Sequence, residues 1–429
     1  MTIHSFITKI NFYFNSLTCD YINDLTSKKL RQCKNGLQIK DILLYQFMYS
    51  KINVTKDNVC NNINFANKTS IDRTNYYRKE NNIPLIFYKN ITKQITLFCQ
   101  DFLKQENKVI AIDGTYSNIS NKSVLNMGYY DVNTKLAIDL VHGNIGQRNH
   151  ELKCCIKYIK DNVDEFKNTI IICDRAYYSY SFMKFLEQHK IDYIIRCKNN
   201  CKNKEKFTRL ISYEDIYDKI IFTRHTKHKE KTKHILEVKN NCIIATNIKD
   251  KTDEELLNMY KSRWTIETYF KLIKKNFKIQ NIKEKQNTCV QNQKIYYCTI
   301  CINNIMEVIN FYLNKNDYIV NKSILIEGIY KCLLEKIIQG NVTYDDIENI
   351  KKYFNKKCTN KENRNFPRIS KTPFTKWYVK SYSNHNNLNY IIKKILSEDI
   401  QDLNKNQKLI VNSINKIKDL YGDILKTLK

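Results

Sequence analysis

Three acidic residues, Asp113, Asp174 and Glu267, have the type and setting that metal-assisted chemistry needs. Asp113 follows the apolar run 108–112 and Asp174 follows the run 168–173, so each is expected at the end of a buried strand. If these strands are neighbours in one sheet, the two carboxylates lie close together and repel unless they are protonated or bridged by cations. Mg²⁺ prefers such oxygen ligands, and Glu267 would complete the site. Because turns favour Asp, each aspartate alone is equally well explained as a turn residue.

The third acid lies in a stretch, 260–277, that lacks Gly and Pro and is expected to form one helix. One face of that helix is apolar, and an adjacent polar stripe carries Tyr260, Arg263, Glu267, Lys271 and Lys274. One carboxylate among several cations suits a site that holds a metal ion and a phosphate backbone together. A solvated surface helix carries similar charges, and the helix alone does not separate the two interpretations.

The elements around the acids follow the order β-β-β-α-β-α-β between residues 108 and 196, which is the order of an RNase H-like sheet. The expected fold class is therefore α/β: an RNase H-like catalytic domain with a β-rich insertion, flanked by helical N- and C-terminal regions. The expected divisions are a helical, possible DNA-binding region 1–105, the catalytic domain 106–197 and 249–310, the insertion 198–248, and a helical region 311–429 with a basic segment 355–381.

The chain has 429 residues and a formal net charge of +29, which points to a polyanion, with nucleic acid first and an anionic membrane second. Lys, Asn, Ile and Tyr all have AT-rich codons, so a drift of genome composition is an alternative source of the lysines. The Arg residues are the more informative cations for this reason.

Fifteen Cys are scattered without the spacing of a disulfide scaffold. No secretory signal and no run of about 18 apolar residues is visible, so we expect no membrane span. Reduced thiols in an intracellular, DNA-associated protein are the simplest account.

The pattern Tyr260-x2-Arg263-x3-Glu267-x6-Lys274 resembles the Tyr-Arg-Glu-Lys signature of DDE transposases of the insertion-sequence-four family. Asp113, in "IDGT", and Asp174, in "CDRAYYS", match the two aspartate motifs of that family. The likeness covers roughly residues 105–310 and extends weakly into the stretch 363–371.

The resemblance implies metal-dependent cleavage at transposon ends and strand transfer into target DNA by a dimer bound to two terminal inverted repeats. It implies that Asp113, Asp174 and Glu267 are the catalytic triad and hold two Mg²⁺ or Mn²⁺ ions. The expected DNA contacts are Tyr260, Arg263 and Lys274, together with Lys271, Arg175 and Arg368.

Two features depart from the family pattern. Ala176 replaces the usual Gly after Asp-Arg. The insertion has no Trp, which stacks on a flipped base in members that pass through a DNA hairpin, so use of a hairpin stays open. A catalytically inactive DNA-binding relic and an RNase H-like nuclease without strand transfer are the alternative functions.

Overall fold

The computed structural model describes residues 1–25, 37–104, 108–119, 122–142, 151–197, 209–225, 231–282, 288–314 and 321–353. The chain divides into two compact units. The first comprises residues 1–210 and 244–360, and the second comprises 211–243 and 361–429. The boundary expected near residue 105 therefore lies inside the first unit. Among the described residues, no helix is both long and apolar enough to cross a membrane.

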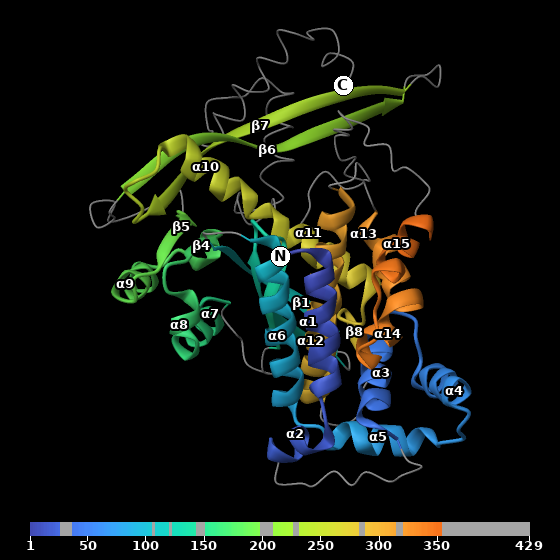
Figure 1. The fold of residues 1–429 in the computed structure, drawn as a ribbon. Coiled ribbons are helices and arrows are strands. Elements are labelled where there is room, and N and C mark those ends of the chain that lie inside the picture. The colour runs from blue at the N-terminus through green and yellow to red at the C-terminus, as the bar shows by residue number, and fades with distance from the viewer. Residues whose placement is uncertain are drawn as a thin grey trace, which may run out of the picture. The chain divides into compact units, whose positions relative to one another are not determined.

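A mixed sheet forms the centre of the first unit (Figure 1). Its strands lie in the order β3-β2-β1-β4-β5, with β1–β2 and β2–β3 antiparallel and β1–β4 and β4–β5 parallel. This order confirms the expected RNase H-like fold. The strands are β1 (Val109–Ile119), β2 (Lys122–Asp131), β3 (Leu136–His142), β4 (Ile170–Cys173) and β5 (Asp192–Arg196).

The two central strands are apolar on both faces because helices cover both sides of the sheet. Ile110, Ile112, Ile171 and Ile172 are at most 2% exposed. These β-branched side chains favour the extended backbone, so the local sequence and the burial specify the same structure.

The insertion continues from the other edge of the sheet. Residues Ile244–Thr246, at the end of β7, pair antiparallel with β5. The insertion was expected to be β-rich, and it holds two long strands. They are β6 (Arg209–His225) and β7 (Lys231–Thr246), which are neighbours in the sheet.

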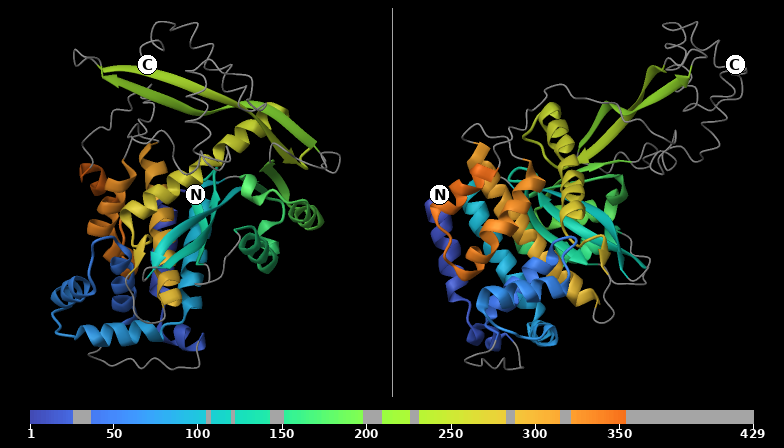
Figure 2. Two further views of the ribbon diagram at one scale, coloured as in Figure 1. Left: turned by 180° about the vertical axis from the view of Figure 1, so that it is seen from behind. Right: turned by 90° about the vertical axis from the view of Figure 1, so that its right-hand side faces the viewer.

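The N-terminal region is helical, as expected. Helix α1 lies beside α6, and α6 lies beside the long helix α12, as Figure 2 shows from two further directions. The helices are α1 (Ile3–Ser16), α2 (Cys19–Asp24), α3 (Ile39–Ser50), α4 (Lys56–Asn67), α5 (Arg73–Asn82) and α6 (Leu85–Leu103).

Helix α12 (Thr288–Asn314) covers the edge strand β3 with polar side chains. The Asn304 side chain accepts from the Ala137 N–H and donates to the Ala137 carbonyl, both at 2.9 Å. Gln293 accepts from the His142 N–H and donates to the Leu140 carbonyl, both at 2.8 Å. These two amides therefore satisfy backbone groups that a further strand would otherwise bind.

The remaining elements connect or flank the sheet. Helices α7, α8 and α9 lie in the crossovers that follow β3 and β4, as parallel strands require. They are α7 (Glu151–Asp161), α8 (Val163–Phe166), the 3₁₀ turn η1 (Arg175–Tyr177) and α9 (Tyr180–Gln188). The later elements are α10 (Asp253–Ser262), α11 (Trp264–Asn276), β8 (Asn281–Ile282), α13 (Lys322–Gly328), the π-helical turn η3 (Ile329–Leu333), α14 (Leu334–Gln339) and α15 (Tyr344–Tyr353).

Candidate active site

Two aspartates lie at matching positions of the adjacent parallel strands β1 and β4. Asp174 directly follows β4, as expected, but Asp113 lies inside β1, which continues to Ile119 in antiparallel pairing with β2. The expectation that Asp113 ends its strand was therefore wrong. Ile112 is paired with Cys173, and Asp113 and Asp174 are the next residues of the two strands. The Asp113 carboxylate accepts a hydrogen bond from the Gly114 N–H at 2.9 Å. Asp174 caps η1 by accepting from the Ala176 N–H at 2.7 Å. Parallel pairing thus places the two acids side by side, as the sequence predicted.

The stretch that was expected to form one helix contains two. Helix α10 ends at Ser262, α11 begins at Trp264, and Arg263 joins them. Arg263 keeps helical dihedral angles, with φ -49° and ψ -35°. The hydrogen bonds, however, change here: the Arg263 N–H donates to the Tyr260 carbonyl, and the Ile266 N–H donates to the Arg263 carbonyl. Both bonds span three residues, so the helix tightens locally to a 3₁₀ pattern. The prediction of one continuous helix was therefore wrong at Arg263.

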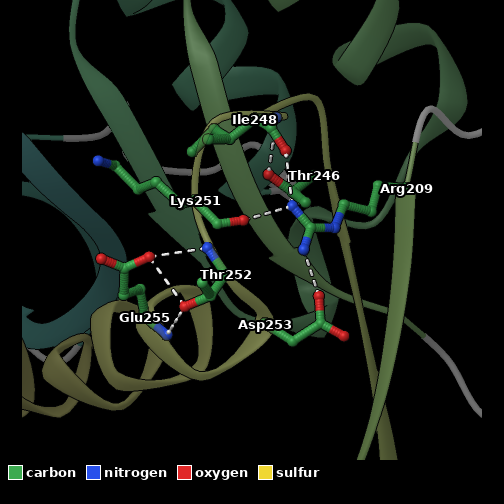
Figure 3. A network of polar contacts seen from close by, with 7 residues as sticks. All are labelled: Arg209, Thr246, Ile248, Lys251, Thr252, Asp253 and Glu255. Carbon is green, nitrogen blue, oxygen red and sulfur yellow. Dashed lines mark hydrogen bonds and ion pairs between the residues drawn. The ribbon is translucent and has the colours of Figure 1, made fainter.

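The start of α10 is fixed by a polar network (Figure 3). Arg209 donates to the carbonyls of Lys251, at 2.7 Å, and Ile248, at 3.3 Å, and forms an ion pair with Asp253. Thr252 and Glu255 form a capping box around the first turn of α10. These contacts hold the start of the helix that leads to Arg263.

Helix α11 packs closely on the sheet through Phe270. A Cβ atom added at Gly128 would lie only 2.7 Å from the Phe270 ring. Gly128 is paired with Asp113 across β1 and β2, so the Phe270 contact lies beside the strand position that carries the first aspartate. Ile266 and Ile273 on the same face of α11 are fully buried, as the apolar stripe predicted. This packing brings Glu267 towards Asp113 of β1, to which it is linked through Arg263.

Arg263 lies between two of the predicted carboxylates. Its Nη2 atom is 2.9 Å from Glu267 Oε1, and its Nη1 atom is 3.6 Å from Asp113 Oδ2. The side chains of Arg263, Asp113 and Glu267 are 14%, 15% and 25% exposed. The sequence placed Arg263 and Glu267 on one stripe but did not predict that the guanidinium would pair with both acids.

The site is electrostatically coupled. Burial raises the pKa of Asp113 to about 7; Arg263 opposes this rise, and Asp174 and Glu267 add to it. Burial also raises the pKa of Tyr260 to about 12, although Arg263, which shares a hydrogen bond with it, lowers that pKa. Tyr260 is 7% exposed. Such a crowded set of buried anions favours the binding of a cation.

The donor set fits a divalent ion by its chemistry. Carboxylate oxygens are the ligands that Mg²⁺ and Mn²⁺ take, and the Arg263 guanidinium already stands as a cation between two of them. Within the described ranges, however, no three His, Cys, Asp or Glu side chains are grouped as ligands of one ion. Arg263 pairs with Asp113 and Glu267 where the sequence predicted metal ions.

The other predicted DNA contacts differ in exposure. Lys271 is exposed, and its Nζ atom lies 5.2 Å from the centre of the Trp264 ring. Lys274 is half-buried, and burial lowers its pKa. Arg175 is half-buried at the start of η1. Arg368 lies outside the described residues, as does the whole basic segment 355–381.

Two residues at the site were missed from the sequence. Trp264 is 49% exposed, although it directly follows the buried Arg263. Its position inside the signature could have marked it as a surface aromatic. No local signal indicates the role of Gly128, because its contact with Phe270 joins residues far apart in the chain.

Part of the chain is similar to known transposases. Residues 124–303 match the family model described as the transposase DDE domain, a range that includes Asp174 and Glu267 and begins after Asp113. The chain is 24% identical over 208 residues to a protein of Synechocystis sp. assigned as the transposase for insertion sequence element IS4SA. That match covers 46% of this chain and 58% of the relative.

A solved structure is also similar: a cryo-EM structure of piggyBac transposase in a synaptic complex with hairpin DNA. The likeness has a TM-score of 0.39 and 11% identity, and it covers 88% of this chain and 87% of that chain. The chain matches a little over half the length of the Synechocystis relative. Residues 124–303 are thus similar to a transposase DDE domain, and the chain resembles a transposase of an insertion sequence element.

Proposed function

We propose that the protein is an active DNA transposase that cleaves transposon ends and joins them to target DNA. The observation that carries this proposal is the placement of Asp113 and Asp174 at matching positions of adjacent parallel strands, with Glu267 of α11 linked to Asp113 through Arg263. A structural relic has no need to keep three acids and a half-buried arginine together.

Asp113, Asp174 and Glu267 would hold two divalent ions. Such ions lower the pKa of the attacking water or 3′-hydroxyl and stabilise the leaving oxygen of the phosphodiester. The three acids are half-buried, and partial removal from water strengthens their interaction with any cation there.

DNA would bind along the exposed side of α11. Lys271, Trp264 and Lys274 lie on or beside that side, and a lysine contacts a phosphate as a point charge. The substrates would be terminal inverted repeats and target DNA. Because each transposon has two ends, the active species would be a dimer on DNA.

The test is cleavage of a DNA duplex that carries the sequence flanking the coding region, with Mg²⁺ or Mn²⁺. Asp113→Asn, Asp174→Asn and Glu267→Gln should each reduce cleavage by at least about a thousandfold, because a metal ligand is lost. Binding to the duplex should stay within about threefold, because phosphate contacts supply most of the affinity.

The matched control is Asp164→Asn, which removes an exposed acid paired only with its neighbour Lys167. It should cleave like the wild type. A triad variant that cleaves at the wild-type rate would remove that residue from the proposed site. A wild-type protein that binds but never cleaves the duplex, with either metal, would identify the relic instead. Cleavage without joining to target DNA would identify a nuclease.

A further inference from the structure

Arg263 is held on several sides at the centre of the acidic cluster. One nitrogen is 2.9 Å from Glu267 Oε1 and another is 3.6 Å from Asp113 Oδ2. Tyr260, one turn earlier, also shares a hydrogen bond with it. The side chain is 14% exposed, so most of the guanidinium is enclosed by these groups.

The guanidinium stays charged in this setting. Burial lowers the pKa of Arg263, but Tyr260, Asp113, Glu267 and Asp174 raise it further, and the net shift is upward. Arginine also offers several N–H donors in a planar fork, so one side chain can bind two carboxylates at once. Arg263 is therefore a permanent cation among the acids.

A divalent ion at the cluster competes with this arrangement. Asp113 directs one carboxylate oxygen to the Gly114 N–H and the other towards Arg263. Glu267 directs its Oε1 atom to Arg263 as well. An ion bound by both acids would take oxygens that Arg263 engages and would lie next to another positive charge. Arg263 and the ions thus exclude one another unless the guanidinium moves.

We infer that Arg263 acts as a counter-cation of the carboxylate cluster. In the DNA-free protein its guanidinium occupies the cluster and prevents divalent ions from binding there. When a DNA phosphate binds the guanidinium instead, the carboxylates become available to the ions. The inference rests on the proposed function. A phosphate is a suitable competitor because it accepts two parallel hydrogen bonds from an arginine, as a carboxylate does. Metal binding and DNA binding then favour each other, since a coupling between two ligands is reciprocal.

The test measures Mn²⁺ binding to the DNA-free protein by electron paramagnetic resonance and titration calorimetry. Arg263→Gln removes the charge and leaves a shorter, neutral polar side chain. It should bind Mn²⁺ at least about tenfold more tightly than the wild type, because the ion no longer displaces a cation. The double variant Arg263→Gln with Asp113→Asn should lose this gain, which locates the ion at the cluster.

Arg73→Gln is the matched control, because Arg73 also pairs with a carboxylate, Asp57 at 2.8 Å, but both side chains are exposed and lie on α5 and α4. Its Mn²⁺ affinity should equal that of the wild type. Arg263→Lys keeps the charge and should stay close to the wild type. An Arg263→Gln protein that folds, as judged by circular dichroism, and binds Mn²⁺ no better than the wild type overturns the inference.

A second measurement needs no variant of Arg263. The wild type saturated with the flanking-sequence duplex should bind Mn²⁺ about tenfold more tightly than the DNA-free wild type. The signal of Asp113→Asn with the same duplex is subtracted, so that Mn²⁺ bound outside the cluster is not counted. Equal affinity with and without DNA also overturns the inference. If the wild type cleaves DNA while these affinities do not change, the counter-cation role fails and the proposed transposase stands. If the wild type does not cleave and Asp113→Asn leaves Mn²⁺ binding unchanged, the proposed function itself fails.

Discussion

Neighbouring side chains of the signature differ in exposure, and this difference decides which of them can contact a DNA backbone. Tyr260 is buried and shares a hydrogen bond with Arg263, so its position suits orienting the guanidinium. Lys271 is exposed beside the half-exposed Trp264 ring. A cation next to an aromatic face is a common combination on surfaces that bind single-stranded or distorted DNA.

Lys271→Gln should weaken binding to the flanking-sequence duplex while leaving the cluster intact. Losing one phosphate contact lowers the slope of log affinity against log salt by about 0.9. The measurement is fluorescence anisotropy over a series of salt concentrations. Lys184→Gln, on α9, is the control, because Lys184 pairs with Glu187 and should leave the slope unchanged. An unchanged slope in Lys271→Gln would exclude a phosphate contact.

At the scale of elements, the approach of α11 to the sheet depends on one small residue. Gly128 leaves room for the Phe270 ring, which would clash with a side chain at position 128. Glu267 lies almost one turn before Phe270 on the same helix, and Asp113 lies opposite Gly128 on the next strand. The Gly128–Phe270 contact therefore sets the separation of the two acids.

Gly128→Ala should destabilise the protein by about 1–3 kcal/mol, because the added methyl group overpacks the contact. Phe270→Leu in the same chain should recover part of this loss, since the smaller side chain makes room. Urea denaturation of the wild type, the two single variants and the double variant measures how strongly the two substitutions are coupled in the free energy of unfolding. We expect this coupling to be at least about 0.5 kcal/mol. Strictly additive effects would show that Gly128 and Phe270 do not share this space.

At the scale of the whole first unit, α12 joins the N-terminal helices to the catalytic sheet. On one side its amides complete the edge of β3. On the other side Lys294 forms an ion pair with Glu80 of α5 at 2.7 Å, with both side chains at most 2% exposed. Gln291 also donates to Glu80 at 2.8 Å. This network anchors α5 to the helix that covers the sheet.

Lys294→Met should destabilise the protein by about 3–5 kcal/mol, because it leaves the buried Glu80 carboxylate without its cation. Adding Glu80→Gln should restore much of the loss, since the remaining side chain is neutral and can still accept from Gln291. Thermal and urea denaturation measure both effects. A cost below about 1 kcal/mol for Lys294→Met would show that Glu80 finds another partner or is protonated.

The sequence by itself determined the order of strands, the apolar face of α11 and the position of Asp174 after a buried strand, whereas Asp113 lies inside β1 rather than at its end. These features have local causes: β-branched runs favour strands, and apolar residues at helical spacing favour one buried face of a helix. Because β1 and β4 are parallel neighbours and Ile112 is paired with Cys173, the RNase H-like order was sufficient to bring Asp113 and Asp174 to matching positions.

Only the tertiary structure decided what surrounds these acids. The placement of Arg263 between Asp113 and Glu267, the close fit of Phe270 on Gly128 and the covering of β3 by Asn304 all join segments that are distant in the chain. Asn304 and Ala137, for example, are separated by 167 positions. Propensity and periodicity describe a segment and its neighbours, whereas the pairing of one buried charge with another depends on how whole elements pack.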